Sequence, residues 1–393
     1  MNHDEILRLE DQFQIPTYAK IPLAIERGDG PFVWDASGDR YIDFYGGHCV
    51  SILGHSPKPV VDAIKRQADK ILFYSNLVYN STRAQAAKLL CSLSPPGLDQ
   101  VFFCNSGSEA NETALKLARK ATNKSTILAM EHGFHGRTLG SLSATHGDKY
   151  RNPYASILPP AEFVPFGNAD VVDDTLSAND DIAAVILEPI QSMAGVRTAP
   201  AGYFQDLAKI CSEHGVVLIF DEIQTGCGRT GKFVYAQQVG VTPDIITLAK
   251  SLGSGVPVGA TLVSDELAST IKLGDHGSTF GGGMIAMAAV TATLETIADY
   301  DLAARAVSIA DHIADSLKPL VSDVRGAGCL LGVELPYPAK EFISSLRTNG
   351  LLVGGSDDPN TIRLMPPLNC PEDVLDQALD IITAALSSVK AAA

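Results

Sequence analysis

The feature that most constrains the fold is a series of short apolar runs that lack polar alternation and are separated by helix-like segments. Strands with one face in water alternate apolar and polar residues, whereas strands buried on both faces are apolar throughout. Such runs, alternating with helices, are typical of α/β folds with a parallel sheet. The predicted buried strands are residues 101–103, 126–129, 183–187, 216–220 and 244–248, and the predicted helices include residues 109–121 and 202–214.

The two ends of the chain differ in pattern from the middle. Residues 31–44 contain turn signals at 35–38, which indicate a small hairpin or meander. From about residue 302 onward, helix-like segments surround one strand candidate, residues 330–335. We therefore expect a large central-sheet α/β domain over residues 50–295 and a small α+β domain that combines residues 1–49 with residues 296–393.

A polar segment with a glycine follows the first predicted strand and leads into a helix. It contains Ser106, Gly107 and Ser108. Free amides at a helix N-terminus, together with the helix dipole, make an anion site, and a glycine lets the backbone approach the anion closely. The same residues also suit an ordinary helix start with serine as the N-cap. Taken alone, the segment favours the simple cap.

Two charged residues end later apolar runs. Asp221 follows residues 216–220, at the edge where ligands bind in open α/β sheets, although a carboxylate there also commonly caps the next loop. Lys250 follows residues 244–249, and burial there would lower its pKa and leave a neutral amine able to attack an aldehyde. The alternative is a lysine whose stem is buried while its ammonium group reaches solvent.

Together, these three elements match the needs of pyridoxal 5'-phosphate (PLP). The cofactor requires an anchor for its phosphate, a carboxylate partner for its pyridinium nitrogen and a lysine that forms a Schiff base. The anion cup at residues 106–108, Asp221 and Lys250 supply one group of each kind. The sequence thus predicts a PLP enzyme, provided that the three elements converge.

The sequence resembles the class III (ω-) aminotransferases of PLP fold type I over nearly the whole chain, from about residue 30 to residue 368. In motif wording it is nearest to the acetylornithine, ornithine and 4-aminobutyrate aminotransferases. The motifs that carry the resemblance are NSGSEANE (105–112), FHGRT (134–138), EPIQ (188–191), DEIQTGCGRTG (221–231), AK (249–250), GSTFGG (277–282) and RLMPPL (363–368).

The resemblance implies a role for each matching residue. Lys250 would be the Schiff-base lysine and proton carrier, and Asp221 would pair with the ring nitrogen. The phosphate would be held by Gly107 and Ser108 beside Ser106, and by Thr279 from the other subunit of a homodimer. Phe134 would stack on the ring and Gln224 would reach its hydroxyl. Arg363 would bind the α-carboxylate of an amino acid, with Arg137 as a candidate for a second carboxylate. His135 is treated as scaffold, and Glu188 as a residue that orders its loop.

Three departures from the family pattern concern the substrate. Relatives usually have a glutamate where this chain has Met193, and that glutamate screens the α-carboxylate arginine while an ω-amino donor binds. Methionine cannot pair with Arg363, which should therefore stay available. Gly283 and Met284 stand where Asn-Pro is usual. His48 lies in a stretch that lines the substrate pocket in relatives, where it is either a substrate contact or a core histidine.

The implied reaction is a ping-pong transamination from an amino-acid or ω-amino donor to a 2-oxo acid. Racemases, decarboxylases and phospho-lyases use the same cofactor site, and many lack the switch glutamate, so Met193 keeps them as the alternative. A non-catalytic PLP-binding regulator is a further alternative, against which the intact Lys250 argues.

The charge and the cysteines limit the partners and the compartment. The net charge of -15 disfavours nucleic acid and anionic membranes as partners, and no apolar run is long enough to span a bilayer. Seven scattered cysteines without a CxxC pair, and a polar N-terminus, lead us to expect a cytoplasmic protein with reduced thiols. No metal site is predicted.

Overall fold

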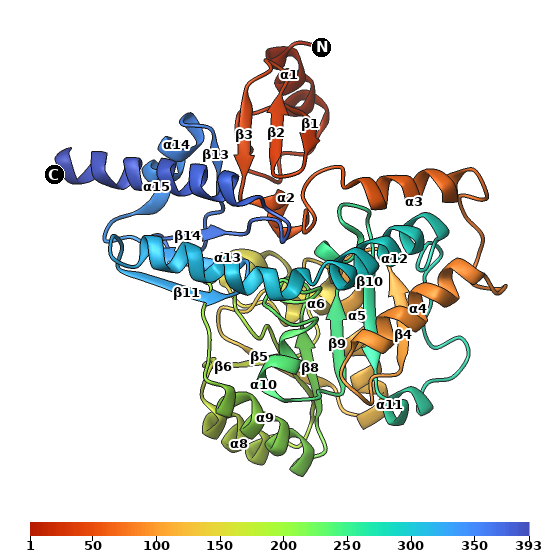
Figure 1. The fold of residues 1–393 in the computed structure, drawn as a ribbon. Helices are drawn as coiled ribbons and strands as arrows, with labels where there is room; N and C mark the ends of the chain where they lie inside the picture. Colours follow the sequence, from red (N-terminus) through yellow and green to blue (C-terminus); the bar gives the residue numbers. More distant parts are fainter. Residues whose placement is uncertain (393) are drawn as a thin grey trace.

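The computed structural model describes residues 1–392 and is built around a seven-stranded sheet (Figure 1). Neighbouring strands are parallel except at β10 (Gly259–Val263), which pairs antiparallel with both β9 (Ile245–Leu248) and β4 (Gln100–Cys104). The order across the sheet is β4 (Gln100–Cys104), β10 (Gly259–Val263), β9 (Ile245–Leu248), β8 (Val217–Asp221), β7 (Ile182–Leu187), β5 (Thr126–Met130) and β6 (Ala161–Val164). This architecture confirms the predicted α/β class.

Helices cover both faces of this sheet, which explains why its strands are apolar throughout. In β5, Ile127 and Ala129 pack in one hydrophobic cluster with α5 (Gly107–Thr122) and α11 (Asp265–Ser269). Leu128 and Met130 face the opposite side and belong to the main core with α9 (Ala201–Glu213). Successive side chains of a strand point to opposite faces, so a strand buried on both sides needs apolar residues at every position.

The predicted strands of this sheet are all present, with small shifts at their ends. β8 ends at Asp221, so the carboxylate is the last residue of the strand rather than the first of the loop. No strand was predicted for β6 or for β10, a short strand that comes shortly after the glycine- and proline-containing segment 253–257. The two predicted helices correspond to α5 and α9.

The two ends of the chain meet in a second, four-stranded sheet. It contains β1 (Ile25–Asp29), β2 (Phe32–Asp35) and β3 (Arg40–Asp43), and β13 (Leu351–Leu352) joins it parallel to β3. β2 and β3 are the predicted hairpin at residues 31–44, and β12 is the predicted strand near residue 330. A third sheet consists of β11 (Asp323–Ala327), β12 (Leu330–Glu334) and β14 (Thr361–Leu364).

The remaining helices surround these sheets, with α14 and α15 near the N-terminal strands and α13 beside α15 and β11 in Figure 1. Among the described residues, none of the helices has both the length and the apolar character needed to cross a bilayer. The helices not yet given are α1 (His3–Phe13), α2 (Gly46–Cys49), α3 (Lys58–Ala68), α4 (Ser81–Leu93), α6 (Leu139–Ser143), α7 (Asp148–Arg151), α8 (Ala169–Ala178), α10 (Tyr235–Val239), α12 (Met284–Asp299), α13 (Leu302–Leu317), α14 (Ala339–Thr348), α15 (Glu372–Ala392) and the 3₁₀ turns η1 (Asn152–Ile157) and η2 (Lys250–Gly253).

Candidate active site

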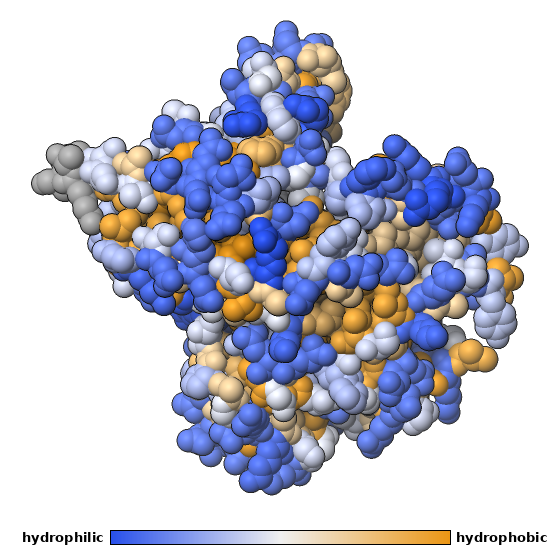
Figure 2. All heavy atoms as spheres, in the orientation of Figure 1, coloured by the Kyte–Doolittle hydropathy of each residue, from blue (hydrophilic) through white to orange (hydrophobic). Residues whose placement is uncertain are grey.

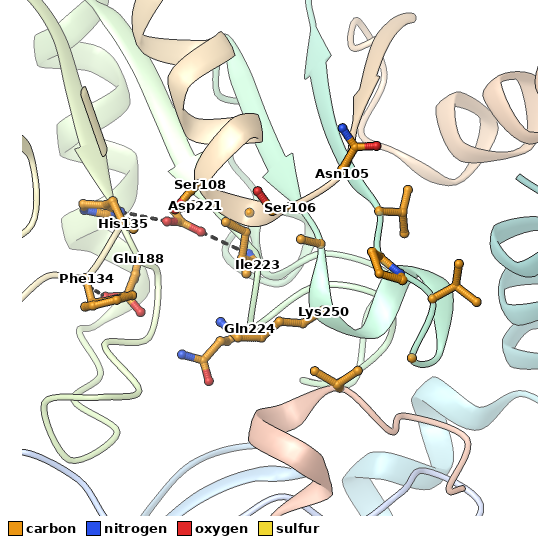
Figure 3. A pocket seen from close by; sticks show the side chains of 18 residues that line it. Asn105, Ser106, Ser108, Phe134, His135, Glu188, Asp221, Ile223, Gln224 and Lys250 are labelled. Atoms are coloured by element: carbon orange, nitrogen blue, oxygen red, sulfur yellow. Dashed lines mark hydrogen bonds and ion pairs between the residues drawn. The ribbon is translucent and has the colours of Figure 1, made fainter. Parts of the chain in front are cut away.

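A cavity of about 380 Å³ lies at the carboxyl ends of the parallel strands of the large sheet (Figure 3). This is the edge at which open α/β sheets bind their ligands. The segments that end or follow β4, β5, β7, β8 and β9 all contribute to its lining. The predicted site residues that line it are Ser106, Gly107, Ser108, Phe134, Asp221, Gln224 and Lys250.

The first turn of α5 forms one wall of the cavity. Ser106 is the N-cap, and its Oγ accepts a hydrogen bond from the amide of Glu109 at 3.2 Å. A Cβ on Gly107 would lie 2.7 Å from Cδ1 of Ile223, so any larger residue would displace that side chain. First-turn amides have no carbonyl partner within their helix, and the helix dipole adds positive potential there. The segment is therefore both a capped helix start and a wall suited to an anion.

The loop after β5 fixes the hydroxyl of Ser108. Ser108 Oγ accepts a hydrogen bond from the amide of Arg137 at 3.1 Å. The preceding residue, Gly136, has φ +136°, and a Cβ there would collide with the same Oγ. Only glycine meets both requirements without strain. Ser108 is thus held with its own hydrogen free to donate toward the cavity.

A buried polar network holds the Asp221 carboxylate at the end of β8. Its Oδ2 accepts from Asn111 Nδ2 at 2.8 Å and lies 2.8 Å from His135 Nδ1, and its Oδ1 accepts from the amide of Ile223 at 3.2 Å. Thr247 Oγ1 donates to Asn111 Oδ1 at 2.8 Å, which fixes the orientation of the amide. Because a carboxylate oxygen accepts, His135 Nδ1 carries the hydrogen in this contact. Sequence reasoning treated His135 as scaffold and did not identify Asn111.

Lys250 follows β9 and turns into the cavity. Its φ is +35°, an unfavourable region for a residue with a side chain, and such strain concentrates at functional sites. The side chain extends toward the wall where Asp221 and Gln224 lie (Figure 3). Burial lowers the pKa of Lys250, and the charge of Asp221 opposes that shift. Among the described residues, no carboxylate forms an ion pair with its Nζ, so Lys250 is suited to react as a neutral amine.

The residues of the cavity fit PLP. Gln224 Oε1 is buried without a hydrogen-bond partner among the described groups, as expected of an atom placed for a ligand hydroxyl. The first turn of α5 suits a phosphate, Asp221 suits a protonated ring nitrogen, and Phe134 provides a flat apolar wall. In the described part of the chain, no three His, Cys, Asp or Glu side chains gather as they would around a metal ion.

Glu188, which sequence reasoning left as a loop-ordering residue, also lines the cavity. Its Oε1 accepts from the amide of Phe134 at 2.8 Å, and the residue is only 4% exposed. Burial raises the pKa of Glu188 to about 7; nearby His135 opposes the shift and Asp221 reinforces it. Like Asp221, Glu188 lies where an apolar run ends, so its position in the sequence was an available signal.

We expect Glu188→Gln to change how stability depends on pH. A carboxyl whose folded pKa is raised stabilises the fold below its unfolded pKa, near 4.5, and this contribution is lost as pH rises through about 7. Relative to Glu188→Gln, the wild type should therefore lose about 1 to 3 kcal/mol of unfolding free energy between pH 5 and pH 8. Urea unfolding of both proteins across this range measures the difference. Parallel pH profiles would show that Glu188 does not titrate there.

Arg363, on β14, lies outside the cavity lining but is almost completely buried, at 2% exposure. Its Nη1 donates to Ser192 Oγ at 2.9 Å and its Nε donates to the carbonyl of Gly355 at 2.7 Å. Burial lowers its pKa, while Tyr45 and more distant acids oppose the shift. Both direct partners are uncharged, and in the described chain no carboxylate lies within ion-pair distance of it.

His48 belongs to a turn with left-handed backbone, where its φ is +73°. Its Nδ1 shares a hydrogen bond with the hydroxyl of Tyr45, which sequence reasoning did not identify. Burial, together with the positive charges of Arg363 and Lys250, lowers the pKa of His48 to about 4. His48 is therefore a neutral group beside two candidate site residues.

The other two predicted site residues, Arg137 and Thr279, do not line the cavity. Arg137 is exposed, and its guanidinium lies 4.1 Å from the ring centre of Tyr150 and 5.6 Å from that of Phe134. Thr279 is also exposed and does not line the cavity of its own chain. Its neighbour Ser278 accepts a hydrogen bond from Asn105 Nδ2 at 3.1 Å, which places this segment next to the cavity wall.

The chain is similar in sequence and in fold to known aminotransferases. The family model described as "Aminotransferase class-III" matches residues 14–386. The acetylornithine aminotransferase of Methanopyrus kandleri is 44% identical over 382 residues, which cover 96% of this chain and 98% of that protein. An ornithine aminotransferase structure from Toxoplasma gondii, described with partial PLP occupancy at its active site, aligns with TM-score 0.92 at 29% identity, covering 98% of this chain and 95% of that one. The acetylornithine aminotransferase of Elizabethkingia anophelis aligns with TM-score 0.87 at 32% identity, covering 99% and 100%.

Proposed function

The chain belongs to the class III aminotransferases, and from this membership we propose which residues carry the reaction and which substrates it takes. It is a PLP-dependent enzyme that transfers an amino group from a donor to a 2-oxo acid. The relatives support transamination rather than the racemase, decarboxylase or phospho-lyase chemistry that Met193 had kept open. The proposal concerns the individual residues, the donor and the assembly.

The cavity residues divide the task of holding the cofactor. The amides of Gly107 and Ser108, with the Ser106 and Ser108 hydroxyls, bind the phosphate, and Phe134 stacks on the ring. Asp221 holds the proton on the ring nitrogen, supported by the network behind it. When bound, PLP accepts electron density from the substrate carbon that loses its proton. The side-chain amide of Gln224, whose Oε1 is buried without a partner among the described groups, contacts the ring hydroxyl.

Lys250 is the residue that binds the cofactor covalently and moves the proton. In its uncharged form, which burial favours, Nζ takes the proton from the donor carbon and delivers it to the carbonyl carbon of the cofactor. The buried setting of Lys250 supports this role because an ammonium group could not accept a proton. Nearby Glu188 contributes a carboxyl that is half protonated near pH 7.

Arg363 defines the class of substrate. The observation that carries this proposal is a buried guanidinium whose direct partners, Ser192 and Gly355, are uncharged. A buried cation without a counter-charge is costly, so a substrate carboxylate that pairs with it gains affinity. Donor and acceptor therefore both carry a carboxylate. N-acetylornithine is the first donor to test, because similar proteins are named acetylornithine aminotransferases. Arg137 receives a second carboxylate at the mouth, and His48 contacts substrate as a neutral partner.

Replacing Arg363 tests this proposal. We expect Arg363→Ala to weaken both half-reactions by about tenfold or more, because each substrate loses a charged hydrogen-bond partner. Donors without an anionic group, such as simple diamines, should be poor substrates of the wild type and should lose little. Single-turnover absorbance changes of the bound cofactor measure each half-reaction separately. A loss confined to the 2-oxo acid half-reaction would contradict the proposal and would indicate a hidden screening acid.

Met193→Glu provides the matched variant for this test. It restores an acid at the position that screens the arginine in relatives, so it should improve ω-amino donors relative to α-amino donors. Met193 is partly exposed, so the substitution does not bury a new charge.

A homodimer completes the proposed enzyme. Exposed apolar side chains cluster on two segments that touch each other, since the rings of Phe73 and Phe280 lie 5.2 Å apart. Figure 2 shows apolar atoms over the nearby part of the face that α4 and β4 occupy in Figure 1. Covering such a surface with a second copy would bring Thr279 toward the partner's cofactor. The exposed apolar residues of these segments are Ile71, Leu72, Phe73, Tyr74, Leu77, Val78, Tyr79 and Phe280.

The chain organisation and the compartment complete the proposal. The division into residues 50–295 and residues 1–49 with 296–393 is supported by the sheet in which β13 pairs with β3. A cytoplasmic location is supported by the seven cysteines, all of which are free thiols.

A further inference from the structure

An ion pair links two loops beside the Arg363 site. Lys149 Nζ, on α7, lies 2.9 Å from Asp357 Oδ1, which belongs to the connection between β13 and β14. Lys149 also lies 4.6 Å from the ring centre of Tyr150, the ring on which Arg137 stacks. The ring of Tyr150 lies 6.0 Å from that of Phe134, which lines the cavity. The ion pair therefore connects α7, beside this cavity wall, to the strand connection that precedes Arg363.

The backbone of Asp357 is fixed next to the partners of Arg363. The amide of Asp357 donates to the carbonyl of Met193 at 2.7 Å, and Met193 follows Ser192, which accepts from Arg363. On the other side, Gly355 accepts from Arg363 Nε and lies two residues before Asp357. The backbone of Asp357 is thus tied to Met193, the residue after one partner of Arg363, and lies two residues after the other. The negative charge of Asp357 raises the pKa of Arg363, against the effect of burial.

We propose that Lys149 is a positioning residue that holds the Asp357 carboxylate away from Arg363 and so keeps Arg363 available for the substrate carboxylate. The inference rests on the proposed role of Arg363 as the carboxylate anchor. With methionine at position 193, Asp357 is the partly exposed acid whose backbone contacts that position. Its alternatives are to pair with Lys149 at the surface or to screen Arg363 in the site. Lys149 favours the first alternative through the charged hydrogen bond that it donates to Asp357 Oδ1.

The other acids near Arg363 are already engaged. Asp358 accepts from Thr361 Oγ1 at 2.9 Å and lies 3.4 Å from Arg325 Nη2. Glu188 is bound to the amide of Phe134 and is largely neutral below pH 7. Asp357, at 50% side-chain exposure, has the freedom to change partners. A pair this exposed adds little to stability, so variants of it should fold normally.

Lys149→Met tests the proposal. Once released, Asp357 should screen Arg363 and raise the KM for a 2-oxo acid by about tenfold. The rate with a simple diamine, relative to an α-amino acid, should rise, because a screened arginine no longer opposes a donor without an anion. A purely structural role for Lys149 would not raise the KM for the 2-oxo acid and at the same time improve the diamine relative to the α-amino acid. Lys149→Arg keeps the cation and should behave like the wild type.

The double variant Lys149→Met with Asp357→Asn separates the explanations. Without the acid there is nothing to screen Arg363, so the KM for the 2-oxo acid should return to within about twofold of wild type. If the double variant is as impaired as Lys149→Met, Lys149 contacts the substrate directly and the proposal is wrong. An unchanged KM in Lys149→Met also overturns it. If Arg363→Ala itself leaves the KM for the 2-oxo acid unchanged, Arg363 is not the carboxylate anchor. That result rejects the proposed function of Arg363, whereas a KM that changes in Arg363→Ala but not in Lys149→Met rejects only the role of Lys149.

Discussion

Lys250→Ala should lower turnover by about 10⁴-fold or more while the protein still folds. The substitution removes both the amine that attaches to the cofactor and the base that moves the proton, and no other described amine lines the cavity. Alanine keeps a Cβ at the positive φ of +35°, so the backbone geometry of this position is unchanged. The measurement is steady-state turnover with an amino-acid donor and a 2-oxo acid, with PLP in excess.

The matched control is Lys209→Ala, which removes an exposed lysine from α9, remote from the cavity lining. Its turnover should equal that of the wild type. Substantial turnover in Lys250→Ala, with the cofactor still attached to the protein, would mean that another amine performs the chemistry.

Asp221→Asn should lower turnover by about 10²-fold or more. The amide keeps the shape of the carboxylate and its one oxygen can still accept from Asn111 and His135, but it has no charge to hold a proton on the ring nitrogen. Electron withdrawal from the substrate carbon therefore weakens. Cofactor binding should persist through the first turn of α5, so the loss should appear in kcat rather than in cofactor occupancy.

Asp244→Asn is the control for this variant. Asp244 is also a partly buried acid of the large sheet, and its Oδ2 accepts from the amide of Leu218 at 2.8 Å, at the edge remote from the cavity. Its turnover per folded molecule should stay near that of the wild type. If Asp221→Asn is equally active, the ring nitrogen does not depend on this carboxylate.

Local chemistry made Lys250 and Asp221 predictable. Each ends an apolar run, where a buried charge is costly unless it is paired or hydrogen-bonded. Parallel strands bring their carboxyl ends to the same edge of the sheet, where ligands bind. The same logic applies to Glu188, which directly follows β7, although its sequence context also suits a residue that only orders its loop. The backbone contact with Phe134 shows that Glu188 orders the loop and also faces the cavity.

Contacts between distant segments could not be predicted in this way. Asn111 reaches Asp221 across 110 residues, and Ser192 reaches Arg363 across 171. No local pattern marks either partner, because an asparagine in a helix and a serine in a turn are common without such contacts. The strand β10 was missed for a related reason: its five residues are stabilised by two neighbours rather than by their own periodicity.

The predicted role of Thr279 depends on a second subunit, which a single chain does not include. Its own cavity does not include it, and the prediction assigns it to the cofactor of a second copy. The exposed rings of Phe73 and Phe280 nearby are the physical reason to expect that copy.

The attachment point of the cofactor tests the account most directly. Purified holoenzyme is reduced with sodium borohydride, digested with a protease and analysed by mass spectrometry. We predict a phosphopyridoxyl group on Lys250 and on no other lysine, because Lys250 is the amine that lines the cavity. A label on a different lysine, or stable PLP binding without any reducible link, would contradict the account.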